Sequence, residues 1–461
     1  MHWICLRFTF LLSLFLVPLF AAPRVVQQGG APLDQATTEA LVARYEVSEH
    51  WVQKAVITLS LNRYWHPSGN QIVLAGMRGK DPRMRAFAVE ALLRSDPGLL
   101  PKVATTEMLD ELIGKQLSAR NDLYGKRVLE ILGRMCPSVD ANKKSAWSAW
   151  WRKHKDSHQP LAWEPIAQSQ TADGNTAAAA QRAFDLNQQG LDLMICIDST
   201  GSMQSTIDAL ASALGEMADI LAGISPKLRL GVVHYKDNDE LGDAGAEVVQ
   251  KLSKNIKATR KKLDKLRAIG GGDLPEAVLG GLDMALGKSM KWGAQANKLV
   301  ILIGDAPPHP EEKQAAVDLA RMAFEKPGTQ NDKRPTTGAR KPQTPFLTSA
   351  IGVFSKIAPG VRVGPGFGQF QKSQQQMRDD FQEIAKAGGG VFVEVEFVID
   401  GKVLTSKEKR AAKANGGGVA SQATRMIVEH ILVLSFGERF KSEMKEFVRI
   451  FYTYKEAGLI K

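Results

Sequence analysis

One stretch of this sequence decides its fold: residues 191–203, LDLMICIDSTGSM. The short apolar run Leu193–Ile197 predicts a buried β-strand. Asp198 follows the strand directly, and the polar turn after it leads into an amphipathic helix expected at Met203–Leu221. A carboxylate that ends a buried strand just before a helix is typical of sheets in which strands and helices alternate, where ligands collect at the carboxyl ends of strands.

The same alternation continues along the chain. Strands are expected at Leu193–Ile197, Leu228–Val233, Leu299–Ile303, Phe346–Val353 and Val391–Val395. Helices are expected between them at Met203–Leu221, Ile256–Leu266, Pro275–Leu286, Glu311–Phe324 and Met377–Ala387. Uniformly apolar strands indicate a sheet covered on both faces. The fold class is therefore α/β, with a doubly wound, mostly parallel sheet.

Two inserts and two closing helices complete this region. Residues 326–345 are rich in proline and basic side chains, and residues 400–418 are basic and end in three glycines, so both are expected to be surface loops. Amphipathic helices are expected at Met426–Leu434 and Glu438–Tyr454. Their apolar faces are expected to pack on the sheet.

The turn after the first strand carries oxygen donors suited to a metal ion. Asp198, Thr200 and Ser202 place one carboxylate and two hydroxyls at a helix start. Such hard oxygen donors suit Mg2+, Mn2+ and Ca2+. Alone, the motif is equally explained by helix capping, for which Asp, Thr and Ser are ordinary residues.

Two further carboxylates strengthen the metal interpretation. Asp273 follows Gly270-Gly271-Gly272 and precedes Pro275, and Asp305 follows the strand Leu299–Ile303. Because parallel strands end at one edge of the sheet, these loops are expected to meet Asp198 there. Glu276, in the first turn of the helix expected from Pro275, is explained either by the helix dipole or by orienting the site.

In this order and spacing, the Asp-x-Thr-x-Ser pattern, the glycine-rich loop and the strand-terminal Asp305 resemble the metal-ion-dependent adhesion site of von Willebrand factor type A domains. The resemblance covers about residues 188–400 and the closing helices. It implies that Thr200 and Ser202 bind the metal directly and that Asp198 and Asp305 bind through water. It also implies an open coordination position for a partner's carboxylate.

The second loop departs from the integrin-like pattern, because Asp273 stands where that pattern has a threonine. The variant is similar to other branches of the family, including hemicentin-like and alpha-kinase-associated proteins. The implied metal site is Asp198, Thr200, Ser202, Asp273 and Asp305, with Mg2+ or else Mn2+ or Ca2+ as the ion. The alternative is a degenerate domain whose aspartates only cap helices.

Residues 33–165 are helical in pattern. Asp81-Pro82 predicts one helix start, and Asn121-Asp122 predicts another about forty residues later, a period typical of helical repeats. The stretch resembles HEAT-repeat proteins, and a plain helical bundle is the alternative. Trp147, Trp150, Trp151 and Trp163 then follow; they either seal this domain against the next or dock a sugar. Residues 166–187 are expected to form a linker, and residues 188–461 the A domain.

The first 22 residues predict an exported protein. A short apolar run from Phe8 to Phe20 ends at Ala21-Ala22, as in a secretory signal peptide, although retention as an anchor is the alternative. No other segment is long and apolar enough to cross a bilayer. The expected location is secreted, periplasmic or cell envelope, and the combination of features is similar to uncharacterised exported bacterial proteins.

Composition narrows the function. The net charge is +11, but the basic residues form no recognisable nucleic-acid module and an exported protein seldom meets nucleic acid, so an anionic envelope surface or a solvated basic face is expected instead. Zinc-ligand spacing, phosphate loops and paired nucleophiles are missing from the sequence, so an enzyme is not expected. The sequence favours a metal-dependent protein-binding module; a metal-stabilised scaffold and a hydrolase are the alternatives.

Overall fold

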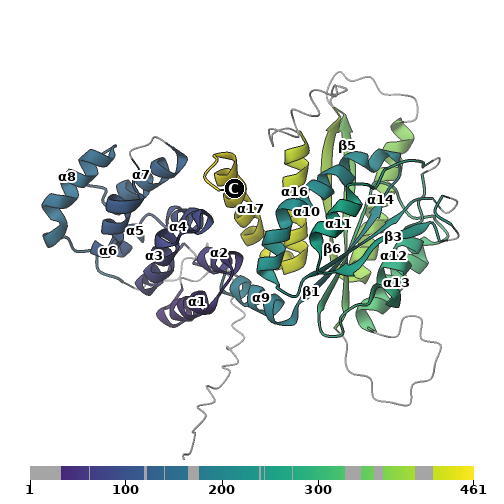
Figure 1. Ribbon diagram of the computed structural model, residues 1–461, viewed down its shortest axis with the longest axis horizontal. Coiled ribbons are helices and arrows are strands. Elements are labelled where there is room, and N and C mark those ends of the chain that lie inside the picture. Colours follow the sequence, from purple (N-terminus) through teal and green to yellow (C-terminus); the bar gives the residue numbers. More distant parts are fainter. Residues whose placement is uncertain are drawn as a thin grey trace, which may run out of the picture.

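The computed structural model describes residues 33–61, 63–118, 122–139, 141–164, 176–237, 240–242, 244–271, 274–327, 344–357, 367–399 and 419–460. They form a stack of helices at one end and an α/β unit at the other, with α9 (Thr176–Gln189) and α17 (Lys441–Glu456) between them (Figure 1). The expected signal peptide lies outside the described residues. No helix among the described residues has the length and apolarity needed to span a bilayer.

The α/β unit is built on a six-stranded sheet with the order β3-β2-β1-β4-β5-β6. The strands are β1 Leu191–Asp198, β2 Arg229–Tyr235, β3 Ala246–Ser253, β4 Asn297–Gly304, β5 Phe346–Ile357 and β6 Gly389–Ile399. The predicted doubly wound sheet is confirmed: every pairing is parallel except that between β2 and β3. Chain order reverses on either side of β1, which places its carboxyl end at the switch point.

Strand β3 was not predicted. It is an edge strand and is only partly buried, so its sequence, AEVVQKLS, mixes polar and apolar residues and lacks the continuous apolar run of the inner strands. The inner strand β1 is buried along its whole length. Leu193, Ile195 and Ile197 belong to the core on one face, whereas Met194 and Cys196 belong to the core on the other.

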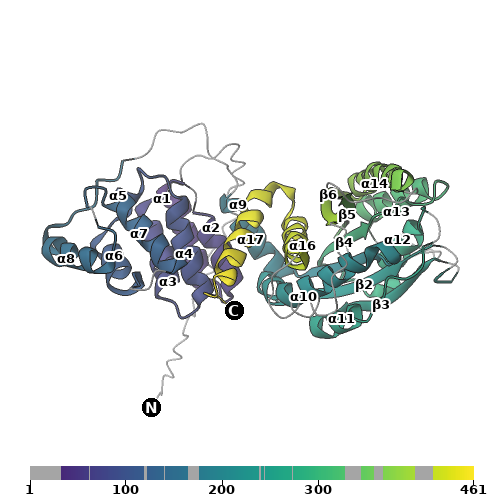
Figure 2. The ribbon, with the colours of Figure 1, turned by 90° about the horizontal axis from the view of Figure 1, so that it is seen from above.

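Helices cover both faces of this sheet (Figure 2). One face carries α10 (Gln204–Ile224), α11 (Ile256–Leu263) and α16 (Val419–Phe436). The other carries α12 (Val278–Leu286), α13 (Lys313–Glu325) and α14 (Phe367–Ala387). Helix α14 begins ten residues earlier than predicted, because its first turns are mostly polar and lack an apolar period.

The helix expected from Pro275 begins only at Val278. The Glu276 amide donates to Pro307 O at 2.9 Å, and the Ala277 amide donates to Lys236 O at 2.8 Å. These bonds to neighbouring loops keep Glu276 and Ala277 outside the helix, so the prediction of Glu276 in a first helical turn was wrong. Glu276 instead pairs with Pro308 in an isolated bridge beside the end of β4.

The N-terminal region is helical, as predicted. Its elements are α1 Gln35–Val47, α2 Trp51–Leu59, α3 Asn70–Arg78, α4 Pro82–Arg94, α5 Leu100–Val103, α6 Thr106–Leu109, a π-helix at Asp110–Gln116, α7 Leu123–Met135 and α8 Lys144–His154. Helices α2, α4 and α7 pack in series, and α1, α3 and the π-helix pack in series beside them. The region is thus a two-layered stack of helix pairs.

Two of these helices show a repeated geometry. Asp81 caps α4 by accepting from Arg83 N, and Asp122 caps α7 by accepting from Gly125 N. At the opposite ends, Arg94 donates to Leu59 O at 3.2 Å and Arg134 donates to Leu93 O at 3.0 Å. Each arginine therefore ties its helix to the end of the preceding helix in the same layer.

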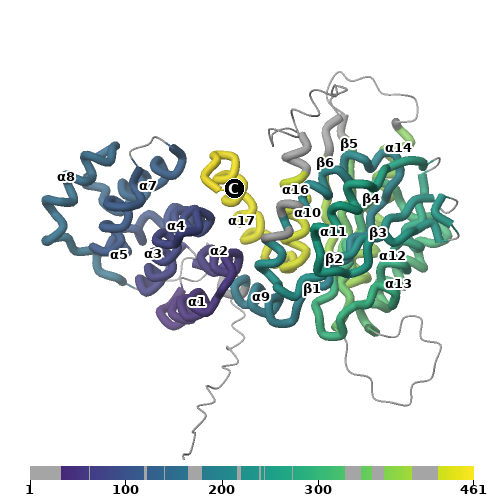
Figure 3. The backbone as a smooth tube through the Cα atoms, in the orientation of Figure 1, coloured from purple at the N-terminus to yellow at the C-terminus, as the bar shows by residue number. Residues whose placement is uncertain are grey.

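The last helix does not pack on the sheet, so this part of the prediction was wrong. Helix α16 packs on α10 and β6, but α17 packs on α2 and α4, bringing the C-terminal segment back to the N-terminal helices (Figure 3). Phe447 of α17 stacks on Trp51, with ring centroids 5.8 Å apart, and also contacts Phe87 at 5.0 Å. The apolar face of α17 is thus used to join the two parts of the chain.

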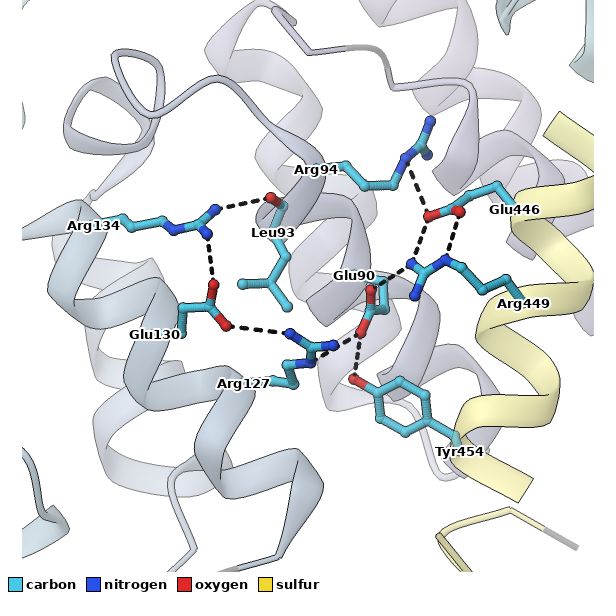
Figure 4. A network of polar contacts seen from close by, with 9 residues as sticks. All are labelled: Glu90, Leu93, Arg94, Arg127, Glu130, Arg134, Glu446, Arg449 and Tyr454. Carbon is cyan, nitrogen blue, oxygen red and sulfur yellow. Dashed lines mark hydrogen bonds and ion pairs between the residues drawn. The ribbon is translucent and has the colours of Figure 1, made fainter. Parts of the chain in front are cut away.

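A buried carboxylate of α4 also holds α17 (Figure 4). Glu90 is 3% exposed and accepts from Arg449 Nη2 at 3.0 Å and from Tyr454 Oη at 3.1 Å. Arg127 of α7 lies 3.5 Å from the same carboxylate. Two cations and a hydroxyl offset the cost of burying this charge, and they require α17 to dock in one register.

Two other sequence predictions need correction. Residues 176–187, expected to belong to a linker, form most of α9, whose Ala179, Ala183 and Leu186 are buried. The tryptophans of α8 do not seal the two parts of the chain, because α8 lies at the far end of the stack (Figure 1). Trp147 and Trp151 are buried there, and Trp151 Nε1 donates to Asp110 of the π-helix at 2.8 Å, so these rings close the end of the stack.

The docking of α17 leads to a prediction about stability. Phe447→Ala removes a side chain that is 1% exposed, so it is expected to lower the free energy of unfolding by about 3 to 5 kcal/mol. The matched control is Phe184→Ala on α9, where the ring is 46% exposed. Chemical denaturation measures both. Equal, small losses in the two variants would show that α17 does not hold the stack.

Candidate metal site

The first loop of the site begins where β1 ends. Asp198 is fully buried, and its Oδ1 accepts from the Thr200 amide at 2.8 Å and from Thr200 Oγ1 at 2.7 Å. These two bonds fold the residues after β1 into a tight turn that ends in a short 3-10 helix, Gly201–Met203, and then in α10. The second carboxylate oxygen of Asp198, Oδ2, is buried and accepts no hydrogen bond.

The second strand end lies beside the first. Ile197 pairs with Ile303 in the parallel β1–β4 ladder, so Asp305 follows β4 next to Asp198, as the sequence predicted. Asp305 is 3% exposed. Burial raises the pKa of Asp305, and hydrogen bonds involving Ser202 and Asp198 oppose that rise. Burial and the neighbouring charge of Asp305 raise the pKa of Asp198.

The glycine loop packs against this turn. Gly201 N donates to Gly270 O at 3.1 Å, and Ile269 N donates to Ser199 O at 3.3 Å. Gly271 has φ +83°, and a Cβ there would lie 2.9 Å from Thr200 Cβ, so only glycine permits this approach. The structure therefore brings the loop before residue 272 to Thr200. Asp273 lies outside the described residues.

Glu276 adds a third buried acid. Its side chain is 2% exposed, and its Oε2 accepts no hydrogen bond. Burial raises the pKa of Glu276, and the charges of Asp198, Asp237 and Asp305 add to the rise. The sequence left the role of Glu276 open. Glu276 lies at the site because backbone bonds hold it beside Pro307 and Pro308, which follow β4 and are distant in the sequence.

These residues fit a divalent cation. Two carboxylate oxygens, Asp198 Oδ2 and Glu276 Oε2, are buried without a donor, and a buried acceptor without a partner is costly. Hydroxyls of Thr200 and Ser202 stand in the same turn, and hard oxygen donors of this kind suit Mg2+. Among the described residues, no three or more His, Cys, Asp or Glu side chains group closely enough to hold a metal by themselves. A metal ion bound here would therefore also need the hydroxyls as donors.

One polar contact at the site was not anticipated. Ser199 Oγ lies 2.8 Å from His234 Nδ1, and His234 Nε2 lies 3.7 Å from Glu247 Oε2. The order Ser-His-Glu is that of a hydrolase, but Ser199 is fully buried and also reaches Tyr235 O at 3.1 Å. The contact ties the first loop to the end of β2. The spacing of motifs could not predict this contact, because Ser199 and His234 are distant in the sequence and meet only in the folded chain.

His309 lies nearby, in a loop as expected. Its Nε2 is 3.4 Å from Asp237 Oδ1, and its ring is 13% exposed. Lys236 is held on the other side of the glycine loop, where its Nζ donates to Ile269 O and lies 3.3 Å from Glu240. Glu240 in turn accepts from Gly271 N at 2.7 Å. These contacts keep the outer rim of the site in place.

Comparison with known proteins agrees with this geometry. A family model described as a von Willebrand factor A domain matches residues 192–324, which contain β2 to β4, all of β1 but its first residue, and every described residue of the candidate site. The match, the mostly parallel sheet and the helices on both of its faces establish that the chain carries a von Willebrand factor A domain.

Two relatives share this segment. The chain is 32% identical over 130 residues to an alpha-protein kinase, vwkA, of Dictyostelium discoideum, covering 28% of this chain and 20% of that protein. It is 32% identical over 124 residues to a putative ariadne-like RING finger protein of Acanthamoeba polyphaga mimivirus, and the match covers 27% of this chain and 12% of that protein. The chain thus spans one fifth or less of the length of these relatives.

Solved structures are similar to the chain as well. The protein BatB from Bacteroides thetaiotaomicron is 15% identical, covers 51% of this chain and 100% of its own, and has a TM-score of 0.30. The pilus adhesin SpaC from Lactobacillus rhamnosus GG is 13% identical and has a TM-score of 0.30, and the match covers 51% of this chain and 30% of SpaC.

Proposed function

We propose that this chain is a metal-dependent protein-binding module of an exported protein. In this proposal Asp198, Thr200, Ser202, Asp273 and Asp305 hold one Mg2+ ion, or Mn2+ or Ca2+ in its place. The bound ion supplies an open coordination position that accepts a carboxylate from a protein partner. von Willebrand factor A domains commonly take part in protein binding and adhesion, which supports this class of function.

The observation that carries the proposal is the burial of Asp198. Its Oδ1 orients Thr200, while its Oδ2 is buried and, apart from the neighbouring acid Asp305, no hydrogen-bond donor serves it. In the proposal Glu276, which is also buried, helps to orient the residues that bind the metal. A cation at this edge would offset both costs, whereas aspartates that only cap helices would have both oxygens bonded or solvated.

The main alternative is a scaffold in which the metal only rigidifies the loops. The backbone bonds between the first loop and the glycine loop would serve either role, so metal-dependent binding of a partner separates the two. A hydrolase ranks below both, because the one serine–histidine contact at the site is buried. We infer export from the apolar run before Ala22, and a HEAT-like second surface from the repeated arginine contacts of α4 and α7.

The metal site makes a direct prediction. Asp198→Ala combined with Asp305→Ala is expected to abolish Mg2+ binding in calorimetry, because both carboxylates are lost from the donor set. The fold should be retained, as judged by near-ultraviolet circular dichroism, because Asp198 ends β1 and Asp305 follows β4, and removing both relieves the repulsion between two buried acids. Asp208→Ala with Asp283→Ala removes two exposed acids from α10 and α12 and is the control. Unchanged Mg2+ affinity in the first variant would reject the site.

Partner binding makes a second prediction. The full chain is immobilised and exposed to cell-envelope extract with Mg2+ or with a chelator, and bound proteins are identified by mass spectrometry. A partner is expected to bind with Mg2+, to be lost with chelator, and to be lost in the Asp198→Ala, Asp305→Ala variant. A partner held equally with chelator, alongside intact Mg2+ binding, would favour the scaffold.

A further inference from the structure

We propose that a basic surface on α11 extends the metal site, so that the two together bind an acidic segment of a polypeptide. We name this surface the α11 basic strip and define it as Lys254, Lys257, Lys261, Lys265 and Arg267. The inference rests on the proposed function: one carboxylate of the segment would occupy the metal, and the acidic residues next to it would lie along the strip.

The charge in this segment is concentrated. Residues 251–267 contain eight basic side chains and a single acidic one, Asp264. The basic residues are Lys251, Lys254, Lys257, Arg260, Lys261, Lys262, Lys265 and Arg267, and all are exposed. A surface that carries so many charges of one sign attracts an opposite partner and speeds its association.

Helix geometry gathers the strip on one side. Lys254, Lys257, Lys261 and Lys265 follow one another at intervals of three and four residues, so they share a face of the helix and its flanking turns. The opposite face, with Thr259 and Leu263, is buried against β2, β3 and α10. The lysines therefore project into solvent from a helix whose backbone is held firmly.

The strip is free to meet a ligand. Arg260, outside the strip, lies 3.8 Å from Asp264, and Arg267 donates only to the backbone oxygens of Asp264 and Leu266. In the part of the chain that the structure describes, none of the four lysines of the strip forms an ion pair. Their charges are thus available to a ligand, which need not break an ion pair within the protein in order to bind them.

Topology brings the strip to the metal edge. Strand β3 is antiparallel to β2 and runs away from the carboxyl ends of the strands, so α11 returns toward them. Arg267 is followed directly by Ala268, whose amide donates to Gln204 Oε1 at 2.9 Å, and by Ile269, whose amide donates to Ser199 O. The strip therefore ends at the loop that carries Asp198, Thr200 and Ser202.

Its length indicates the size of the ligand. At about 1.5 Å per residue, α11 itself spans roughly 12 Å, which an extended chain covers with about four residues, and the flanking turns lengthen the strip at both ends. An acidic polypeptide is the expected polyanion, because in the proposed function the metal accepts a carboxylate from a protein partner. The expected ligand is an extended segment of about four residues or more, rich in Asp and Glu, ending in the carboxylate that binds the metal.

The test uses the full chain and a fluorescein-labelled peptide of eight glutamates, with binding followed by fluorescence anisotropy in Mg2+. Lys257→Gln, Lys261→Gln and Lys265→Gln are combined in one variant. Lys143→Gln, Arg152→Gln and Lys153→Gln, exposed residues on or next to α8, form a control of equal charge. The strip variant is expected to bind about tenfold more weakly, with a shallower dependence on salt, whereas the control should match the wild type.

Other outcomes have definite meanings. Four results would each overturn the proposal. The first two are equal weakening in the two variants and unchanged binding in the strip variant. The other two are no binding of the peptide to wild type and equally tight binding of a sulfated polysaccharide in chelator. If the strip variant loses affinity but chelator and the Asp198→Ala, Asp305→Ala variant do not, the strip stands and the proposed metal bridge fails. Unchanged Mg2+ affinity in the strip variant shows that any loss does not arise from the metal site.

Discussion

Three carboxyl groups, those of Asp198, Asp305 and Glu276, are buried together at one edge of the sheet. Burial raises the pKa of each, and none of the ion pairs formed by the described residues involves any of them. Each of these acids costs folding free energy in its charged form, and the cost grows because their charges repel one another. The packed strands β1 and β4, and the bonds that the Glu276 and Ala277 amides donate to Pro307 O and Lys236 O, hold them there against their repulsion. In the proposed function, a divalent cation bound at this edge would offset that cost.

A contrasting acid stabilises the other end of the chain. Glu90 is as deeply buried, but Arg449, Arg127 and Tyr454 surround it (Figure 4). Its charge is satisfied within the protein, and it fixes α17 on the helical stack. Because α16 packs on α10 while α17 packs on α2 and α4, the end of the chain links the A domain to the stack. The difference between the two buried sites is that only one has its counter-charge built into the chain.

The sequence predicted the sheet and much of the site because both depend on local patterns. Apolar runs marked β1, β2, β4, β5 and β6, and the polar residues after β1 and β4 marked the edge where they meet. The failures share a cause. Strand β3, the start of α12 and the docking of α17 depend on neighbours distant in sequence: an exposed sheet edge, backbone bonds to Pro307 and Lys236, and rings on α2 and α4. Ser199 and His234 likewise meet only in three dimensions.

The most direct measurement of the central claim is anomalous diffraction from crystals of this protein grown with Mn2+. The account predicts one strong peak within coordination distance of Thr200 Oγ1 and Ser202 Oγ, about 2.0 to 2.3 Å, with the carboxylates of Asp198 and Asp305 in direct or water-mediated contact. In the same crystals, Asp198 Oδ2 should no longer lack a partner. A map at saturating Mn2+ without a peak at this edge, in crystals whose loops are ordered, would contradict the account.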